Sequence, residues 1–150
     1  MDKTALGRQG EIFVMQKLLK LGWEFPEDYH NCMDGLDWIF VKQNRKIKIQ
    51  VKCSEKSYPC FNFSLTTFDY LIFTNLRDCY IIPKELISPG KVRLTKTFKK
   101  LKNRFDLVDL NGKELLGALI DLRISPSEFY QTEHIFTKKG DFGQTLKCFS

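Results

Sequence analysis

Asp37, Gln50 and Lys52 have side chains whose types and spacing could carry out metal-assisted chemistry. A hard divalent cation such as Mg²⁺ takes oxygen ligands, usually one or two carboxylates together with several waters. A bound Mg²⁺ polarises a phosphoryl oxygen and lowers the pKa of a bound water. A neighbouring lysine can orient that water or offset charge in the transition state. The three side chains would therefore suit hydrolysis of a phosphate ester if the fold brings them together.

The segments that contain these residues predict a β-hairpin. Residues 34–41 and 46–53 are rich in β-branched and aromatic side chains, and the polar residues 42–45 separate them. With a two-residue loop Asp37 lies opposite Gln50, and with a four-residue loop it lies opposite Lys52 on the same face. A three-residue loop would place Asp37 opposite Val51 and split the group. We predict a loop of even length, although a polar strand face exposed to solvent is the simpler interpretation of Asp37 alone.

A helix over residues 4–21 is expected to precede the hairpin, with Gly22 as its C-terminal stop. Glu11 lies in its middle among apolar neighbours, where it is either a solvated glutamate or a functional one. Gly7 and Gly10 lower the helix propensity, which suggests close approach of the helix to the sheet or to a DNA backbone. Arg8 and Gln9 could then contact phosphates or bases.

Asp37 followed by Gln50-Val51-Lys52, with apolar strand residues between them, resembles the PD-(D/E)xK nuclease superfamily. Residues 7–11 look like the N-terminal acidic helix of that superfamily, and residues 68–73 and 79–83 look like its later strands. The likeness covers about residues 4–88 and implies an α/β (α+β) fold, a restriction-endonuclease-like core with a mixed β-sheet flanked by helices. The pattern is most similar to the bacterial group I intron-encoded homing endonucleases of the superfamily. Leu36 replaces a frequent proline, and Gln50 replaces the acidic residue of (D/E)xK.

The resemblance also implies roles for individual residues. Glu11, Asp37, Gln50 and Lys52 would be catalytic, and Glu11, Asp37, Gln50 and the Val51 carbonyl would hold one or two Mg²⁺ ions, with Mn²⁺ able to substitute. The uncharged Gln50 should bind metal less tightly than a carboxylate, which puts a second metal in question. Double-stranded DNA would be the substrate, and because two strands must be cut, a homodimer at least is expected. The resemblance implies a homotetramer.

Three functions stay open at this point. The first is site-specific cleavage of both DNA strands by an intron homing endonuclease. The second is structure-specific cleavage by a junction-resolvase-like nuclease. The third is DNA binding without catalysis, with Gln50 marking an inactive site.

The later part of the chain predicts short strands at 60–65, 70–74 and 79–83, and the last two are apolar enough to be central. Residues 91–104 carry seven basic side chains and no acidic one, and Leu94, Phe98, Leu101 and Phe105 recur at helical spacing. A basic helix could bind DNA through counterion release, although a solvated face or a membrane-surface helix would share the pattern. The candidate DNA contacts are Arg8, Gln9, Lys56, Arg93, Lys96, Lys99, Lys100, Lys102 and Arg104.

Residues 107–123 read either as a hairpin around Asn111-Gly112 or as a chain segment with a helix at 114–120. Residues 125–150 could wrap the core, contact another subunit or follow DNA.

Composition sets outer bounds on these expectations. A chain of 150 residues predicts one domain, with a core at about 4–88 and a basic elaboration at about 89–150. A net charge of +6 and a pI of about 9.1 favour a polyanionic partner. The five cysteines lack paired spacing, which indicates reduced thiols in a bacterial cytoplasm rather than disulfides or zinc. Neither a membrane partner nor a nucleotide cofactor is expected.

Overall fold

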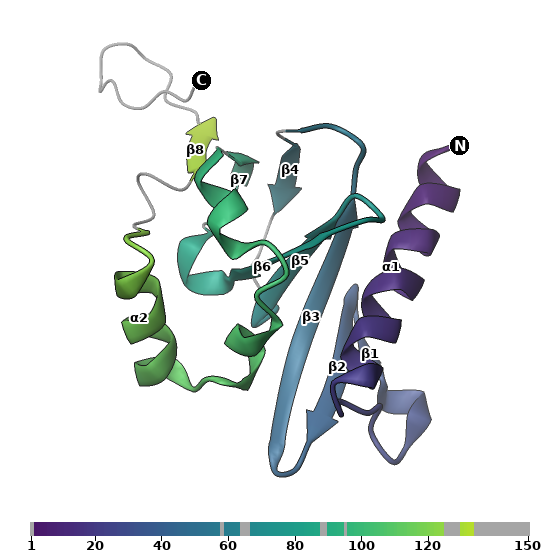
Figure 1. Cartoon of the computed structure of the whole chain (residues 1–150). Helices are drawn as coiled ribbons and strands as arrows, with labels where there is room; N and C mark the ends of the chain where they lie inside the picture. Colours follow the sequence, from purple (N-terminus) through teal and green to yellow (C-terminus); the bar gives the residue numbers. More distant parts are fainter. Residues whose placement is uncertain are drawn as a thin grey trace.

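The computed structural model of the chain describes residues 2–57, 59–63, 67–87, 90–94, 96–124 and 130–133. A five-stranded sheet with the strand order β1-β2-β3-β5-β6 forms its centre (Figure 1). Its strands are β1 (Met33–Asp34), β2 (Asp37–Lys42), β3 (Arg45–Cys53), β5 (Tyr70–Thr74) and β6 (Cys79–Pro83). β3 and β5 are parallel and the other neighbours are antiparallel, which confirms the predicted mixed sheet flanked by helices.

A second sheet contains β4 (Cys60–Phe63), β7 (Gly90–Leu94) and β8 (Tyr130–Glu133) in the order β4-β7-β8. Both neighbouring pairs in this sheet are antiparallel. β8 is all that the structure describes beyond residue 124, so most of the prediction for residues 125–150 lies outside the described residues.

Helix α1 (Lys3–Lys20) lies alongside β3 (Figure 1). The side chain of Asp2 caps it by accepting a hydrogen bond from the backbone N–H of Ala5 at 2.8 Å. Gly10, Val14 and Leu18 form the buried stripe that faces the sheet. A Cβ added to Gly10 would lie 2.6 Å from the Cβ of Cys53, so the prediction of close approach to the sheet is confirmed at this glycine.

The first predicted strand of the hairpin is interrupted. Residues 34–41 were expected to be continuous, but a turn at Gly35, where φ is +66°, separates β1 from β2. Glycine reaches this left-handed conformation without the steric cost that a Cβ imposes. The two short strands then pair with each other, so that Asp34 lies opposite Asp37.

β5 and β6 are buried at every position, as their apolar sequences predict. β5 is central, but β6 is at the edge of the sheet, so the prediction that both strands are central is wrong for β6. Residues 102 and 103 cover that edge, because the backbone N–H of Cys79 donates to Oδ1 of Asn103 at 2.9 Å and Tyr80 forms a β-bridge with Lys102. A covered edge strand can be as apolar as a central one.

The basic segment 91–104 is not the amphipathic helix that its spacing predicted. Its first part is strand β7, and the next part is the short 3₁₀ helix η3 (Lys96–Leu101). Phe98 and Leu101 are buried as expected, and their separation of three residues fits one 3₁₀ turn. Pairing of β7 with β4 and β8 overrides the helical periodicity of the apolar side chains.

Residues 105–121 contain a 3₁₀ helix, η4 (Phe105–Asp109), followed by α2 (Gly112–Asp121), and the hairpin interpretation of residues 107–123 is wrong. Asn111 and Glu114 form a capping box in which each side chain accepts from the backbone N–H of the other residue at 3.1 Å. The helical alternative is therefore correct. In the described part of the chain, no helix is both long and apolar enough to span a membrane.

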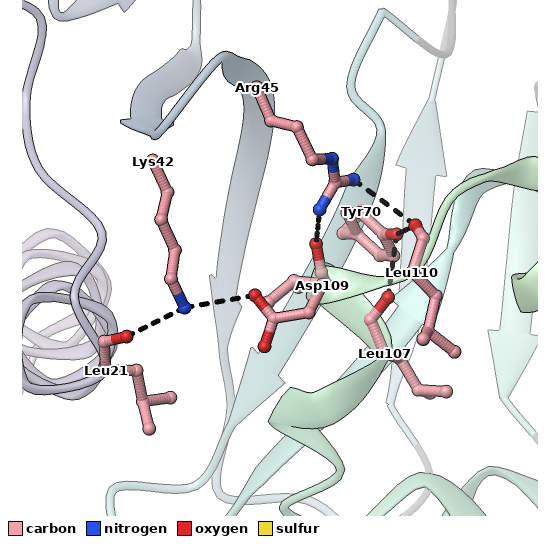
Figure 2. Close-up of polar contacts among 8 residues, drawn as sticks. Leu21, Lys42, Arg45, Tyr70, Leu107, Asp109 and Leu110 are labelled. Carbon is pink, nitrogen blue, oxygen red and sulfur yellow. Dashed lines mark hydrogen bonds and ion pairs between the residues drawn. The ribbon is translucent and has the colours of Figure 1, made fainter.

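Two side chains from the sheet hold η4 against the core (Figure 2). The Arg45 guanidinium donates to the carbonyls of Val108 and Leu110, and the Tyr70 hydroxyl donates to the carbonyl of Leu107 at 2.9 Å. Burial of this hydroxyl raises the pKa of Tyr70. The Leu107 carbonyl also accepts from the backbone N–H of Leu110 at 3.2 Å, so the Tyr70 hydroxyl is its second donor, and the two side chains tie this turn to the sheet.

A neighbouring lysine ties the end of α1 to the same region. Lys42 Nζ lies 3.0 Å from the carbonyl oxygen of Leu21 and 3.2 Å from Oδ1 of Asp109 (Figure 2). The Lys42 ammonium and the Arg45 guanidinium also lie over the Trp23 ring, at 5.5 and 5.6 Å from its centroid. The hairpin therefore connects α1 on one side with η4 on the other.

Arg45→Lys is expected to lower the free energy of unfolding by about 1 kcal/mol, because an ammonium cannot donate to both carbonyls in the fork geometry of a guanidinium. Urea unfolding measures the change. Lys46→Ala removes an exposed cation from the next position and should stay within about 0.5 kcal/mol of the unchanged protein. Equal stability of the Arg45→Lys variant and the unchanged protein would contradict the clamping role of Arg45.

Candidate active site

The hairpin register brings Asp37 level with Gln50. Lys42 pairs with Arg45 and Trp38 pairs with Ile49, so the loop contains two residues and the prediction of an even-length loop is confirmed. Continuing this register by one residue places Asp37 beside Gln50. Directly paired residues share a face of an antiparallel sheet, and Lys52 lies two residues beyond Gln50 on that face. The structure thus gathers the carboxylate, the amide and the lysine on one side of the sheet.

Two oxygen atoms of this group are buried without a hydrogen-bond donor. Asp37 is 1% exposed, and its Oδ1 has no hydrogen-bond partner in the described structure, nor does Oε1 of Gln50. Burying a carboxylate costs several kcal/mol unless a cation or donors compensate for the lost hydration. Carboxylate and amide oxygens are the ligands that Mg²⁺ takes, so these two donor types fit a hard divalent cation.

The second oxygen of Asp37 has a partner that the sequence did not reveal. The Thr67 hydroxyl donates a hydrogen bond to Oδ2 of Asp37. Thr67 lies 30 positions away in the sequence, in the connection between β4 and β5. No spacing rule links such residues, since the contact depends on the path of that connection.

Lys48 also lies on the face of Asp37, and it forms an ion pair with Asp34. The hydrogen bond and charge of Asp34 raise the pKa of Lys48, with smaller contributions from Asp37 and Asp69, and the same pair lowers the pKa of Asp34. The Asp34 side chain is 57% exposed and that of Lys48 is 35% exposed, so solvent partly screens the pair. Lys48 therefore adds positive charge beside the Asp37 carboxylate.

The last residues of β3 extend beyond the start of β2. Asp37 is the first residue of β2, and the register places it beside Gln50. The three residues after Gln50 therefore have no partner on β2 and pair only with β5; they are Val51, Lys52 and Cys53. Lys52 is half-buried at this end of the strand. The roles of the Val51 carbonyl as a metal ligand and of Lys52 in catalysis stay predictions.

Glu11 lies on α1, whose buried stripe packs against the sheet. It follows Gly10, which packs against Cys53 and Thr74, and its side chain is half-buried. In the ranges that the structure describes, no three His, Cys, Asp or Glu side chains form a group that could hold a metal. A Glu11 carboxylate in the metal site stays a prediction.

Most of the predicted DNA contacts are exposed. Arg8 and Gln9 lie on α1, Lys56 follows β3, and the exposed lysines of the later segment are Lys96, Lys99, Lys100 and Lys102. Several of the basic side chains also contact the protein itself: Lys100 Nζ lies 3.1 Å from the Leu122 carbonyl, Lys102 lies 3.7 Å from Asp78, and the half-buried Arg104 pairs with Asp106 at 2.8 Å.

The Arg104–Asp106 pair raises the pKa of the arginine and lowers that of the aspartate. Arg93 lies on β7, and its side chain is outside the described residues.

No protein-family model matches the chain. A UPF0102 protein of Prochlorococcus marinus (strain MIT 9313) is 34% identical over 70 residues, which is 46% of this chain and 55% of that relative. The chain therefore spans little more than half the length of the curated relative that it matches.

Among solved structures, the bacterial homing endonuclease I-Ssp6803I superposes with a TM-score of 0.52 over 83% of this chain and 99% of the other, at 16% sequence identity. At this identity the likeness concerns the fold. The mixed five-stranded sheet with its helices is the restriction-endonuclease-like fold shared with this bacterial homing endonuclease.

Proposed function

We propose that this chain is a metal-dependent DNA endonuclease that hydrolyses phosphodiester bonds in both strands at specific sites, as in intron homing. The observation that carries the proposal is the buried pair of oxygens without donors, Asp37 Oδ1 and Gln50 Oε1, on adjacent strands with Lys52 on the same face. A purely structural pair of buried oxygens would be expected to have donors. In the proposed function, a bound divalent cation takes the place of the missing donors.

The residues at the site would have distinct tasks. Asp37 and Gln50 would hold Mg²⁺, with the Val51 carbonyl and the Glu11 carboxylate as further ligands, and Mn²⁺ could take the same place. The bound ion would supply polarisation of the phosphoryl oxygen and acidification of the attacking water. Lys52 would orient that water and offset the charge that develops on the phosphate. Because Gln50 has no charge, we expect weaker metal binding than at a site with two carboxylates.

Double-stranded DNA is the proposed substrate. The net charge of +6 favours a polyanion, and exposed cations lie on α1, after β3 and on η3. The structural neighbour named as a homing endonuclease supports site-specific cleavage over other uses of this fold. Because each site would cut one strand, we propose a homodimer at least, and a homotetramer as the assembly that the sequence resemblance implies.

One experiment tests this function against its alternatives. The protein is incubated with Mg²⁺ and a random-sequence duplex library, beside a four-way DNA junction and an EDTA control. We expect cleavage at discrete duplex sites that EDTA abolishes. Cleavage of the junction alone would replace the proposal by a structure-specific nuclease. DNA that is bound but intact would show that Gln50 marks an inactive site, as its missing charge suggests.

A further inference from the structure

The hydrogen bond from Thr67 to Asp37 carries an inference that rests on the proposed function. Oδ2 of Asp37 accepts from the Thr67 hydroxyl, while Oδ1 of the same carboxylate has no partner in the described structure. We propose that Thr67 is a positioning residue, which holds Oδ2 so that Asp37 presents Oδ1 alone to the divalent cation. Thr67 would act through Asp37 and would not touch the metal or the DNA.

Thr67 is well placed for this task because the residues after it are anchored. Phe68 is 1% exposed within the core. The backbone N–H of Asp69 donates to the carbonyl of Lys48 at 2.8 Å, and the backbone N–H of Lys48 donates to Oδ2 of Asp69 at 2.8 Å. The two residues that follow Thr67 are therefore anchored to the core and to β3, the strand that also carries Gln50.

A fixed carboxylate matters more for Mg²⁺ than for larger cations. Mg²⁺ requires near-ideal octahedral geometry and is usually bound through one or two carboxylates and several waters. A hydroxyl that donates to one carboxylate oxygen occupies one lone pair of that oxygen and so favours metal binding through the other oxygen. Groups that orient metal ligands in this way typically contribute about 10- to 100-fold to metal affinity or activity.

Removal of the hydroxyl tests the inference directly. Thr67→Val keeps the shape of the side chain and removes the donor, whereas Thr67→Ser keeps the donor. We measure Mn²⁺ binding to the protein without DNA by titration calorimetry, and the Mg²⁺ concentration that gives half-maximal cleavage. Thr67→Val should weaken Mn²⁺ binding and raise the Mg²⁺ requirement by about tenfold or more, and Thr67→Ser should stay within about threefold of the unchanged protein.

Control variants separate this effect from a change in folding. Thr67 is exposed, so each variant should unfold at nearly the temperature of the unchanged protein. If Thr67→Val is poorly folded, Thr67→Ala replaces it with the same expected loss of Mn²⁺ binding. Thr4→Val removes an exposed threonine hydroxyl on α1 and should leave metal binding unchanged.

The outcomes distinguish this inference from the proposed function. Unaltered Mn²⁺ binding and Mg²⁺ dependence in Thr67→Val would overturn the positioning role of Thr67. Cleavage of DNA by the unchanged protein would still support the proposed nuclease. Equal losses in the valine and serine variants would also overturn it, because the hydroxyl would not be the cause. An unchanged protein that binds no Mn²⁺ and cuts no DNA would overturn both.

Discussion

Lys52→Ala is expected to reduce the rate of DNA cleavage by at least about 10²- to 10³-fold while DNA binding persists. Lys52 lies on the face of Asp37 and Gln50, at the end of β3 that extends past β2. An ammonium there would orient the attacking water and offset transition-state charge, and alanine can do neither. Its loss should therefore lower the rate of the chemical step far more than the affinity for DNA.

The measurement is single-turnover cleavage of a duplex carrying a site found in the random library. DNA affinity is measured in parallel by fluorescence anisotropy without divalent metal. One lost positive charge should weaken DNA binding only a few-fold and reduce the salt dependence by at most about one counterion. A large fall in rate with a small fall in affinity would identify Lys52 as catalytic.

Lys46→Ala is the matched control for this prediction. It removes the same charge from the same strand, at the hairpin end of β3 and six positions from Lys52. We expect cleavage close to that of the unchanged protein. If Lys52→Ala also cleaves at the unchanged rate, Lys52 has no part in the mechanism. If both variants lose cleavage equally, the effect comes from overall charge.

The part of the site that lies within the hairpin could be predicted from the sequence. The alternation of side chains along a strand has a period of two, so any loop of even length keeps Asp37, Gln50 and Lys52 together. The two-residue loop at Gln43 and Asn44 meets that condition. The alternation of side chains was sufficient because all three residues lie on the two strands of one hairpin.

The residues that surround this hairpin could not be placed in the same way. Thr67 reaches Asp37 through a connection whose course depends on the burial of Phe68 and the pairing of Asp69 with Lys48. The prediction of a helix over the basic segment 91–104 was wrong for a related reason. Apolar spacings of three and four residues favour a helix, but the first part of the segment pairs with β4 and β8 and forms β7. In both cases long-range contacts decide the structure.

The sequence itself distinguishes the two interpretations of residues 107–123. Asn111-Gly112 is a hairpin signal, but Glu114 follows Asn111 at the spacing of a capping box and precedes an apolar pair. The amide of Asn111 accepts from the backbone of Glu114, as that motif predicts. The capping-box pattern of Asn111 and Glu114 is therefore a better guide to this region than the Asn111-Gly112 dipeptide.

Gly10→Ala is expected to destabilise the protein by about 2 kcal/mol, the largest stability effect that the fold predicts for so small a change. A Cβ at position 10 would lie 2.6 Å from the Cβ of Cys53 and 3.3 Å from Cγ2 of Thr74. The first contact joins two atoms next to the backbone, so no rotamer change relieves it. Overpacking costs about 1–3 kcal/mol, and more when the backbone must shift. The gain in helix propensity of about 1 kcal/mol offsets part of that cost.

Gly7→Ala provides the matched control, since Gly7 belongs to the same helix and a Cβ there would have nothing within 4 Å. Alanine at position 7 should stabilise the protein by about 0.5–1 kcal/mol through helix propensity alone. Urea unfolding of both variants gives the comparison, and equal effects at the two glycines would contradict the close approach of α1 to β3.

A third variant shows whether the clash with Cys53 is the cause. Cys53→Gly combined with Gly10→Ala removes the opposing Cβ, so its loss of stability should be smaller than the sum of the two single losses by about 1 kcal/mol or more. A shift of α1 that relieves the clash in Gly10→Ala would also move Glu11, the next residue of the helix. If Glu11 contributes to the metal site, cleavage should fall in Gly10→Ala and recover partly in the double variant. Additive losses would show that contacts other than Cys53 limit the approach of the helix.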